Sequence, residues 1–268
     1  MKLMKAPWLV LLLLCCVPVA VANAASKSDR AKEKRWESQI VDSLMVGEAV
    51  KLAADGVEFL GLYAESHTDS SKGGVIIMHG IGVHPAWPDV VEPLRMNLPD
   101  LGWHTLSIQM PVLENEAEGK DYIPLLDEAP ARVAAAVKFL QDRDIAPVML
   151  VAHSLGASMA AYYLSQQPQP DVKAAILIGL GSLSDDDDSK FNSLNMLKHI
   201  NVPVMDLYGA NDLENVIKTA AKRKQVMAGV PKKKFLQKKV DGANHFFLGK
   251  ESVLIKIVDN WLSEQAGE

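Results

Sequence analysis

Three polar residues that lie far apart in the sequence could together carry out nucleophilic catalysis. They are Ser154 in "AHSLG", Asp212 in "GANDL" and His245 in "GANHFF". A serine hydroxyl is a weak nucleophile at neutral pH until a histidine takes its proton. The imidazole in turn needs a carboxylate that fixes its tautomer and stabilises the positive charge it acquires. The chemistry therefore depends on whether the fold brings the three side chains together.

Each of these residues also has an ordinary structural explanation. Serine after a strand and aspartate before a helix are common helix caps, and His245 could be a loop histidine without a role. Two other carboxylates compete with Asp212. Asp206 falls inside an expected strand, which makes it a weaker candidate, and Glu214 lies close to the expected position.

The order of the expected elements decides whether the three residues meet. Asp55-Gly56 separates two strand patterns and predicts a hairpin. Beyond it, short apolar runs alternate with helical patterns, as expected for an open, mainly parallel sheet covered by helices on both faces. The expected strands are 48–54, 57–66, 73–80, 103–111, 147–153, 172–180, 202–209 and 233–240, and the expected helices are 89–102, 125–144, 155–167, 193–200, 213–227 and 252–265.

The three polar residues each follow one of these strands. Ligands of open α/β sheets bind at the carboxyl ends of the strands. We therefore expect Ser154, Asp212 and His245 to share this edge, which is the place where a catalytic site would form.

The turn around Ser154 reads A-x-S-x-G, whereas the usual nucleophile turn reads G-x-S-x-G. Small residues on either side of the serine let the strand and the following helix pass closely. Ala152 adds one methyl group at the first of these positions, and Gly156 keeps the second. The helix carries further small residues, Ala157, Ser158, Ala160 and Ala161, which leave room for the methyl group.

The sequence resembles the α/β-hydrolase superfamily from about residue 50 to residue 263. The motifs that carry the resemblance are "MHGIG" (78–82), "AHSLG" (152–156), "GANDL" (209–213) and "GANHFF" (242–247). The resemblance implies an α/β-hydrolase fold with a mostly parallel, eight-stranded sheet and helices on both faces. It also implies a catalytic triad of Ser154, Asp212 and His245.

An oxyanion hole is expected from two backbone amides. One is the N–H of Leu155 at the start of the helix, and the resemblance places the other at Ile81, in the loop after the strand "GVIIM". We interpret His79, which precedes this loop, as a buried histidine that braces it, and His153 as structural.

The N-terminus reads as a secretory signal peptide over residues 1–24. Lys2 and Lys5 precede an apolar run that closes with the small-x-small site Ala22-Asn23-Ala24. An uncleaved membrane anchor is the alternative, although Pro7 and Pro18 shorten the run. Residues 25–45 are expected to be a charged lead-in, either mobile or an exposed helix, and residues 46–268 the α/β-hydrolase domain. The expected location is the bacterial periplasm or the medium, with no stable membrane insertion after cleavage.

Composition narrows the class of protein further. Both cysteines, Cys15 and Cys16, lie in the signal, so the mature chain has no disulfide and no thiolate metal site. Cleavage moves the formal charge from −5 to −7, because Lys2 and Lys5 are lost. A mildly acidic chain with scattered basic residues gives no reason to expect nucleic acid as a partner. We expect no metal and no organic cofactor.

These observations predict a serine hydrolase that acts by acyl transfer on a small-molecule or lipid-like substrate. A carboxylic ester is the expected substrate, and a thioester or an amide is the alternative. Members of the superfamily that carry a cap usually insert it after the sixth strand, so the resemblance and the short interval 180–192 together imply an uncapped site. The rival interpretation is a catalytically weak or inactive binding or scaffold protein of the cell envelope, and the alanine at position 152 is the observation that supports it.

Overall fold

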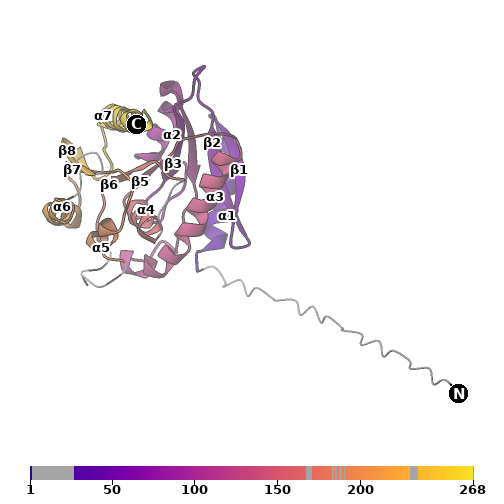
Figure 1. Cartoon of the computed structure of the whole chain (residues 1–268), viewed down its shortest axis with the longest axis horizontal. Helices are drawn as coiled ribbons and strands as arrows, with labels where there is room; N and C mark the ends of the chain where they lie inside the picture. The colour runs from indigo at the N-terminus through magenta and orange to yellow at the C-terminus, as the bar shows by residue number, and fades with distance from the viewer. Residues whose placement is uncertain are drawn as a thin grey trace.

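The computed structural model describes Met1 and residues 27–166, 171–182, 184, 186, 189, 191–229 and 235–267. The expected signal peptide, apart from Met1, and part of the interval 180–192 lie outside the described residues. The described chain forms one eight-stranded sheet in the order β1-β2-β4-β3-β5-β6-β7-β8 (Figure 1). This is the mostly parallel sheet that the sequence predicts.

The first two strands form the predicted antiparallel hairpin. β1 (Glu48–Ala54) pairs with β2 (Val57–Ala64), and Asp55 and Gly56 turn the chain with positive φ angles of 49° and 76°. Two successive positive φ angles are typical of the two-residue turn that suits twisted strands. β2 also runs antiparallel to β4 (Trp103–Ile108), so the hairpin forms one edge of the sheet.

The remaining strands are parallel. β3 (Gly73–Met78), β5 (Val148–His153) and β6 (Ala174–Ile178) are buried along their whole length, because helices cover both of their faces. β7 (Val204–Asn211) follows them, and β8 (Phe235–Asn244) is the outer strand with alternating exposed residues. The carboxyl ends of these strands lie at one edge of the sheet.

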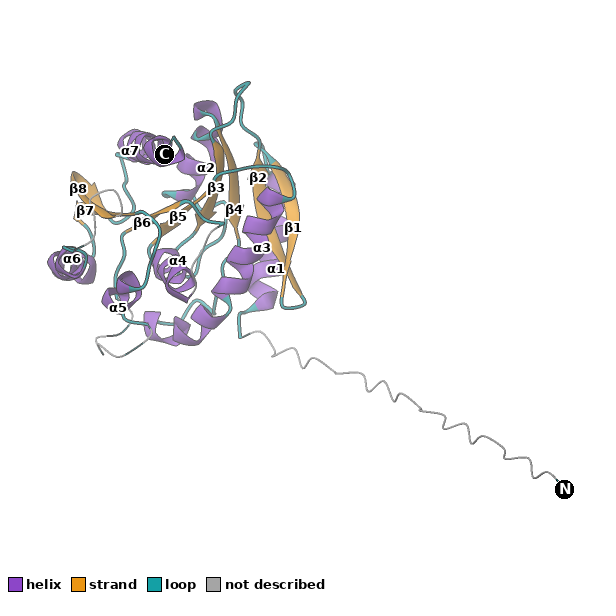
Figure 2. Ribbon diagram, in the orientation of Figure 1, coloured by secondary structure: helices purple, strands orange, loops and turns teal. Residues whose placement is uncertain are grey.

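Helices cover both faces of the sheet (Figure 2), and a hydrophobic core lies on each face. One contains α3 (Ala129–Gln141), α4 (Leu155–Gln166) and α5 (Ser193–Lys198), and the other contains α2 (Val91–Asn97) and α7 (Glu251–Ala266). α6 (Glu214–Val226) packs near β7 and α5. The described residues also contain two 3₁₀ helices, Pro99–Leu101 and Gly119–Asp127.

The charged segment expected as a lead-in is, in its described part, a component of the domain. Residues 30–43 form α1 (Arg30–Ser43), which begins at the cap Asp29, whose carboxylate accepts a hydrogen bond from the Lys32 amide. Ile40 packs against Leu60 and Leu62 of β2. α1 therefore packs onto the domain that is expected to begin at residue 46, because it buries both apolar and paired polar side chains.

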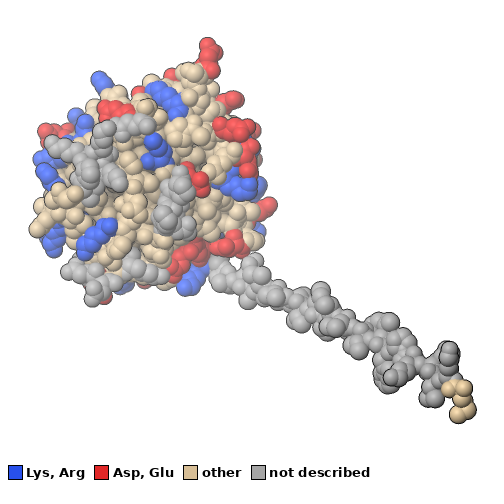
Figure 3. Space-filling model, viewed as in Figure 1, with Lys and Arg blue, Asp and Glu red and all other residues tan. Residues whose placement is uncertain are grey.

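The surface carries charges of both signs (Figure 3). On the face shown, acidic side chains are most frequent on the right of the view, toward the β1 and β2 end of the sheet. None of the helices within the described residues is both long and apolar enough to cross a bilayer.

Candidate active site

Ser154 occupies a tight turn between β5 and α4. Its φ angle is +56°, which is uncommon for a residue with a side chain, and its amide donates to the Ile178 carbonyl oxygen over 2.8 Å. His153 is the last residue of the strand and Leu155 the first of the helix, so no linker separates them. The turn projects the partly exposed Ser154 side chain at the carboxyl edge of the sheet.

The three side chains singled out in the sequence are joined by hydrogen bonds. His245 Nε2 lies 2.9 Å from Ser154 Oγ, and His245 Nδ1 lies 2.6 Å from Asp212 Oδ1. A carboxylate oxygen only accepts, so the Nδ1–H donates to Asp212 and leaves the lone pair on Nε2 facing the hydroxyl. The arrangement has the geometry of a serine–base–carboxylate relay.

Asp212 is held by three donors. Besides His245, the Leu213 amide donates to Oδ1 over 2.8 Å and the Gly209 amide to Oδ2 over 3.1 Å. Burial raises the pKa of the carboxyl, but the hydrogen bonds from His245 and the two amides together outweigh this effect. The pKa of Asp212 therefore lies below its ordinary value, and the group is ionised at neutral pH.

Two glycines leave space for the turn of Ser154 and for the His245 ring. A β carbon at Gly156 would come within 2.4 Å of the His79 carbonyl oxygen, so only glycine lets α4 approach the end of β3. A β carbon at Gly179, where φ is +62°, would lie 2.9 Å from His245 Cε1. Gly156 was recognised in the sequence, whereas Gly179, directly after β6, was missed.

The alanine in the serine turn is accommodated without distortion of the sheet. Ala152 is fully buried in the core with α3 and α4, and it keeps its place in the register opposite Met78 of β3 and Leu177 of β6. Its methyl group fills core space that a glycine would leave empty.

The loop after β3 lies beside the serine. A β carbon on Gly80 would be 3.2 Å from Ser154 Cβ, so the backbone of this loop packs against the serine turn. Among the described residues, neither the Ile81 nor the Leu155 amide donates a hydrogen bond to another protein group. Both N–H groups are thus available at this edge, as an oxyanion hole requires.

His79 holds this loop by hydrogen bonds. It is buried, and burial lowers its pKa to about 3, so the ring is neutral at pH 7. Nε2 accepts a hydrogen bond from the Met110 amide over 2.9 Å. The proton therefore lies on Nδ1, which donates to the Gly80 carbonyl oxygen over 2.8 Å.

His153, the neighbour of the serine, supports the base. Its Nε2–H donates to the carbonyl oxygen of His245 over 2.9 Å, and the two rings lie 4.8 Å apart between centroids. Burial, with a smaller contribution from His245, lowers the pKa of His153 to about 4. A neutral His153 thus anchors the backbone that carries the base.

Exposed apolar side chains lie close in sequence to Asp212 and His245 and in the loop after β3. Leu213 follows Asp212, Phe246 and Leu248 follow His245, and Ile81 belongs to the expected oxyanion loop. All four are between 39% and 55% exposed. The Phe246 ring stands edge-on to His245 with 5.1 Å between centroids. We call Ile81, Leu213, Phe246 and Leu248 the apolar collar.

The competing carboxylates are engaged elsewhere. Asp206 is fully buried and binds Arg223 Nε over 2.8 Å, while Glu214 pairs with Lys218 on the surface of α6. Within the part of the chain that the structure describes, no group of three or more histidine, cysteine or acidic side chains is placed to hold a metal ion.

Solved structures with a similar fold are esterases and related hydrolases. Est1E from Butyrivibrio proteoclasticus aligns with a TM-score of 0.64 at 14% identity, covering 82% of this chain and 99% of that chain. Dienelactone hydrolase from Anabaena variabilis aligns with 0.62 at 20% identity, covering 81% and 96%. A cold-adapted esterase from an Arctic intertidal metagenomic library aligns with 0.65 at 17% identity, covering 81% and 92%.

The sheet order, the helices on both faces and these alignments define the α/β-hydrolase fold, as the sequence predicted. Residues 6–122 and 125–264 match the family described as "Protein of unknown function (DUF3530)", and the chain belongs to this family. No curated protein matches the sequence.

Proposed function

We propose that this protein is a serine hydrolase that cleaves carboxylic esters by acyl transfer. The observation that carries the proposal is the pair of hydrogen bonds that join His245 to Ser154 and to Asp212. The Nδ1–H of His245 donates to Asp212, so the lone pair on Nε2 faces the Ser154 hydroxyl and can accept its proton. A histidine held in this way makes the hydroxyl reactive at neutral pH.

The proposed reaction uses groups of this chain alone. Ser154 Oγ attacks the carbonyl carbon while His245 Nε2 takes the hydroxyl proton. The amides of Leu155 and Ile81 hold the negative charge that develops on the carbonyl oxygen. His245 then gives the proton to the leaving alcohol, and an acyl-enzyme remains. Water, activated by the same histidine, releases the acid and restores Ser154.

The apolar collar supports an uncharged, lipid-like or aromatic substrate. Its four side chains expose apolar surface on residues that lie close in sequence to the proposed catalytic residues or belong to the proposed oxyanion loop, and burying such surface against a ligand is favourable. One neighbour in fold, Est1E, has been solved with ferulic acid bound, and it aligns over 82% of this chain with a TM-score of 0.64. A thioester or an amide is the alternative substrate for the same groups.

The scaffold interpretation loses its main support in this geometry. It rested on Ala152, whose methyl group fits the core without disturbing the strand register. The glycines at 156 and 179 further favour catalysis, because a side chain at either position would disturb the catalytic turn or the base.

Export to the periplasm or the medium remains part of the proposal. It is supported by the basic and apolar N-terminal sequence and by the small-x-small site that ends at Ala24. Mass determination of the protein recovered from an osmotic-shock fraction would test it: export with cleavage predicts a chain that starts at Ala25.

The activity is tested with 4-nitrophenyl esters of acetate, butyrate, hexanoate and decanoate. The proposal predicts hydrolysis of at least one ester by the wild-type protein and loss of that activity in Ser154→Ala. Ser158→Ala, which changes a buried serine one turn along α4, is the matched control and retains activity. Equal hydrolysis by wild type and Ser154→Ala would refute the proposal.

A further inference from the structure

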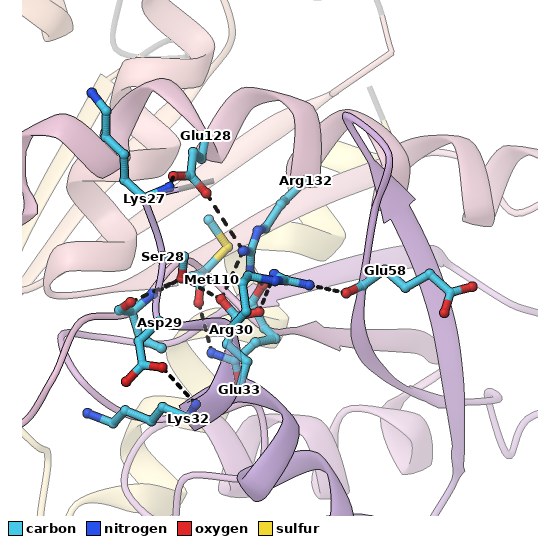
Figure 4. A network of polar contacts seen from close by, with 12 residues as sticks. Lys27, Ser28, Asp29, Arg30, Lys32, Glu33, Glu58, Met110, Glu128 and Arg132 are labelled. Carbon is cyan, nitrogen blue, oxygen red and sulfur yellow. Dashed lines mark hydrogen bonds and ion pairs between the residues drawn. The ribbon is translucent and has the colours of Figure 1, made fainter. Parts of the chain in front are cut away.

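A buried polar network ties the N-terminal segment to the sheet (Figure 4). Ser28 Oγ donates to Glu33 Oε1 over 2.5 Å and accepts from the Val112 amide over 2.8 Å. The Asp29 amide donates to the Val112 carbonyl oxygen over 2.7 Å. The residues before α1 are thus hydrogen-bonded to Val112, in the segment that follows β4.

Arg132 of α3 connects this network to the interior. Its two terminal nitrogens donate in different directions, to Glu33 Oε1 over 2.9 Å and to the Gln109 carbonyl oxygen over 2.9 Å. Arg132 and Glu33 are both almost completely buried, at 3% and 5% exposure. In Figure 4, Arg132 descends from α3 toward Glu33 and Met110. Glu33 also pairs with Arg30, and Arg132 Nη2 lies 3.9 Å from Glu128 Oε2. Loss of a partner inside such a buried charged network is destabilising.

The segment held by Arg132 in turn holds His79. The Met110 amide donates to His79 Nε2 over 2.9 Å, and Gln109 Nε2 lies 3.0 Å from the same nitrogen. Both contacts keep the proton of His79 on Nδ1, from which it is donated to the Gly80 carbonyl oxygen over 2.8 Å.

The last link concerns the peptide between Gly80 and Ile81. In a trans peptide the C=O and the N–H point in opposite directions. Fixing the Gly80 carbonyl oxygen on His79 therefore also fixes the direction of the Ile81 N–H, one of the two amides assigned to the oxyanion hole. The hydrogen bonds thus run without interruption from Glu33 through Arg132, the 109–110 segment and His79 to this peptide.

We propose that Glu33 and Arg132 are positioning residues for the oxyanion hole, so that α1 and the segment before it regulate the competence of the site. The inference rests on the proposed function for its catalytic consequence. The coupling itself concerns the orientation of one peptide and has a readout that needs no substrate. An N-terminal segment undocked from the sheet leaves Arg132 without Glu33, which frees the 109–110 segment and the loop that bears Ile81.

The variants separate positioning from simple stability. Arg132→Met removes both donors, and Arg132→Lys keeps the charge with a shorter reach. Lys32→Met is the matched control on α1, because Lys32 Nζ binds the Leu113 carbonyl oxygen and Asn115 and touches no member of the path. Asp206→Asn breaks the fully buried pair with Arg223 and controls for loss of a buried ion pair outside the path.

The kinetic readout is the split between kcat and KM on the best 4-nitrophenyl ester. Removal of one oxyanion donor costs about 100- to 1000-fold in kcat. Its misorientation in Arg132→Met should lower kcat by about tenfold or more with KM within about twofold. Arg132→Lys should recover part of this loss. Lys32→Met and Asp206→Asn should keep the wild-type kcat, whatever they do to the unfolding midpoint.

The structural readout is the Ile81 amide signal in a ¹H–¹⁵N correlation spectrum of the folded protein. The proposal predicts that the signal shifts or broadens in Arg132→Met and is unchanged in Lys32→Met. An inert wild type with a responsive Ile81 signal would refute the ester hydrolase and uphold the coupling. If the wild type is active but neither the Ile81 signal nor kcat changes in Arg132→Met, the coupling is refuted and the proposed hydrolase activity is unaffected.

Discussion

Gly179 lies against the imidazole of His245 so closely that any β carbon there would come 2.9 Å from Cε1 and 3.0 Å from Nδ1 of this ring. The backbone that follows β6 thus packs directly against the His245 ring. Contacts this short are not tolerated, so a larger residue would displace the ring from the line between Ser154 and Asp212.

Gly179→Ala should therefore lower the rate of ester hydrolysis in protein that is still folded. A displacement of about 1 Å at a reacting group costs up to about 100-fold in rate, and we expect kcat/KM to fall by about 10- to 100-fold. Gly229→Ala is the control, because a β carbon at Gly229 meets no atom within 4 Å. Steady-state kinetics with unchanged activity in Gly179→Ala would contradict the proposed position of the base.

Ala152→Gly restores the usual form of the serine turn and should not improve the enzyme. The methyl group is fully buried, so its loss and the added backbone freedom should lower the free energy of unfolding by about 1 kcal/mol. We expect kcat within about twofold of wild type, because the Ala152 methyl group faces the core. Urea denaturation and ester kinetics on the same samples measure both quantities, and a large gain in kcat would show that the alanine restrains the site.

His153 should make the fold sensitive to mild acid. Its pKa is about 4 in the folded protein, below the ordinary 6.5, so the unfolded chain binds the proton more readily. The contribution of His153 to the free energy of unfolding is fully present above pH 6.5. It falls by roughly 3 kcal/mol in total as the pH decreases toward 4.

The measurement is the free energy of unfolding in urea from pH 7 to pH 4 for wild type and His153→Gln. Glutamine can still donate to the His245 carbonyl oxygen but does not titrate, so its profile should be flatter in this interval. Parallel profiles for the two proteins would contradict the assignment of a neutral, buried His153.

The apolar collar should govern the preference for acyl chain length. Leu248→Ser removes an apolar side chain that is 55% exposed, and we expect the ratio of kcat/KM for hexanoate over acetate to fall roughly fivefold. Leu236→Ser changes a leucine of β8 outside the collar and should leave the ratio unchanged. A ratio that responds equally to both substitutions would show that the collar does not contact the acyl chain.

The sheet could be predicted from the sequence because its central strands are short apolar runs bounded by glycine or turn residues. "GGVIIM" became β3, and Asp55-Gly56 became the hairpin turn. The positions of Ser154, Asp212 and His245 after strands followed from the same pattern. The juxtaposition of their side chains needed the resemblance to a known fold as well as the pattern.

The contribution of α1 could not be predicted in this way. Its sequence is dominated by charges, and a charged helix ordinarily faces solvent. Glu33 is buried between two opposite charges, and although Arg30 lies one turn away on the same helix, Arg132 comes 99 residues later. Gly179 was likewise missed, since its role depends on a histidine from another loop. In both cases the residue is in contact with a partner that is distant in sequence, so no local sequence pattern predicts its role.

Covalent labelling of the folded protein tests the central claim most directly. The account predicts that a fluorophosphonate reacts with one equivalent, that peptide mapping places the adduct on Ser154, and that Ser154→Ala remains unlabelled. Asp212→Asn, which removes the charge that stabilises the protonated base, should label far more slowly than wild type. A folded wild-type protein that stays unlabelled, or an adduct on any other residue, would contradict the account.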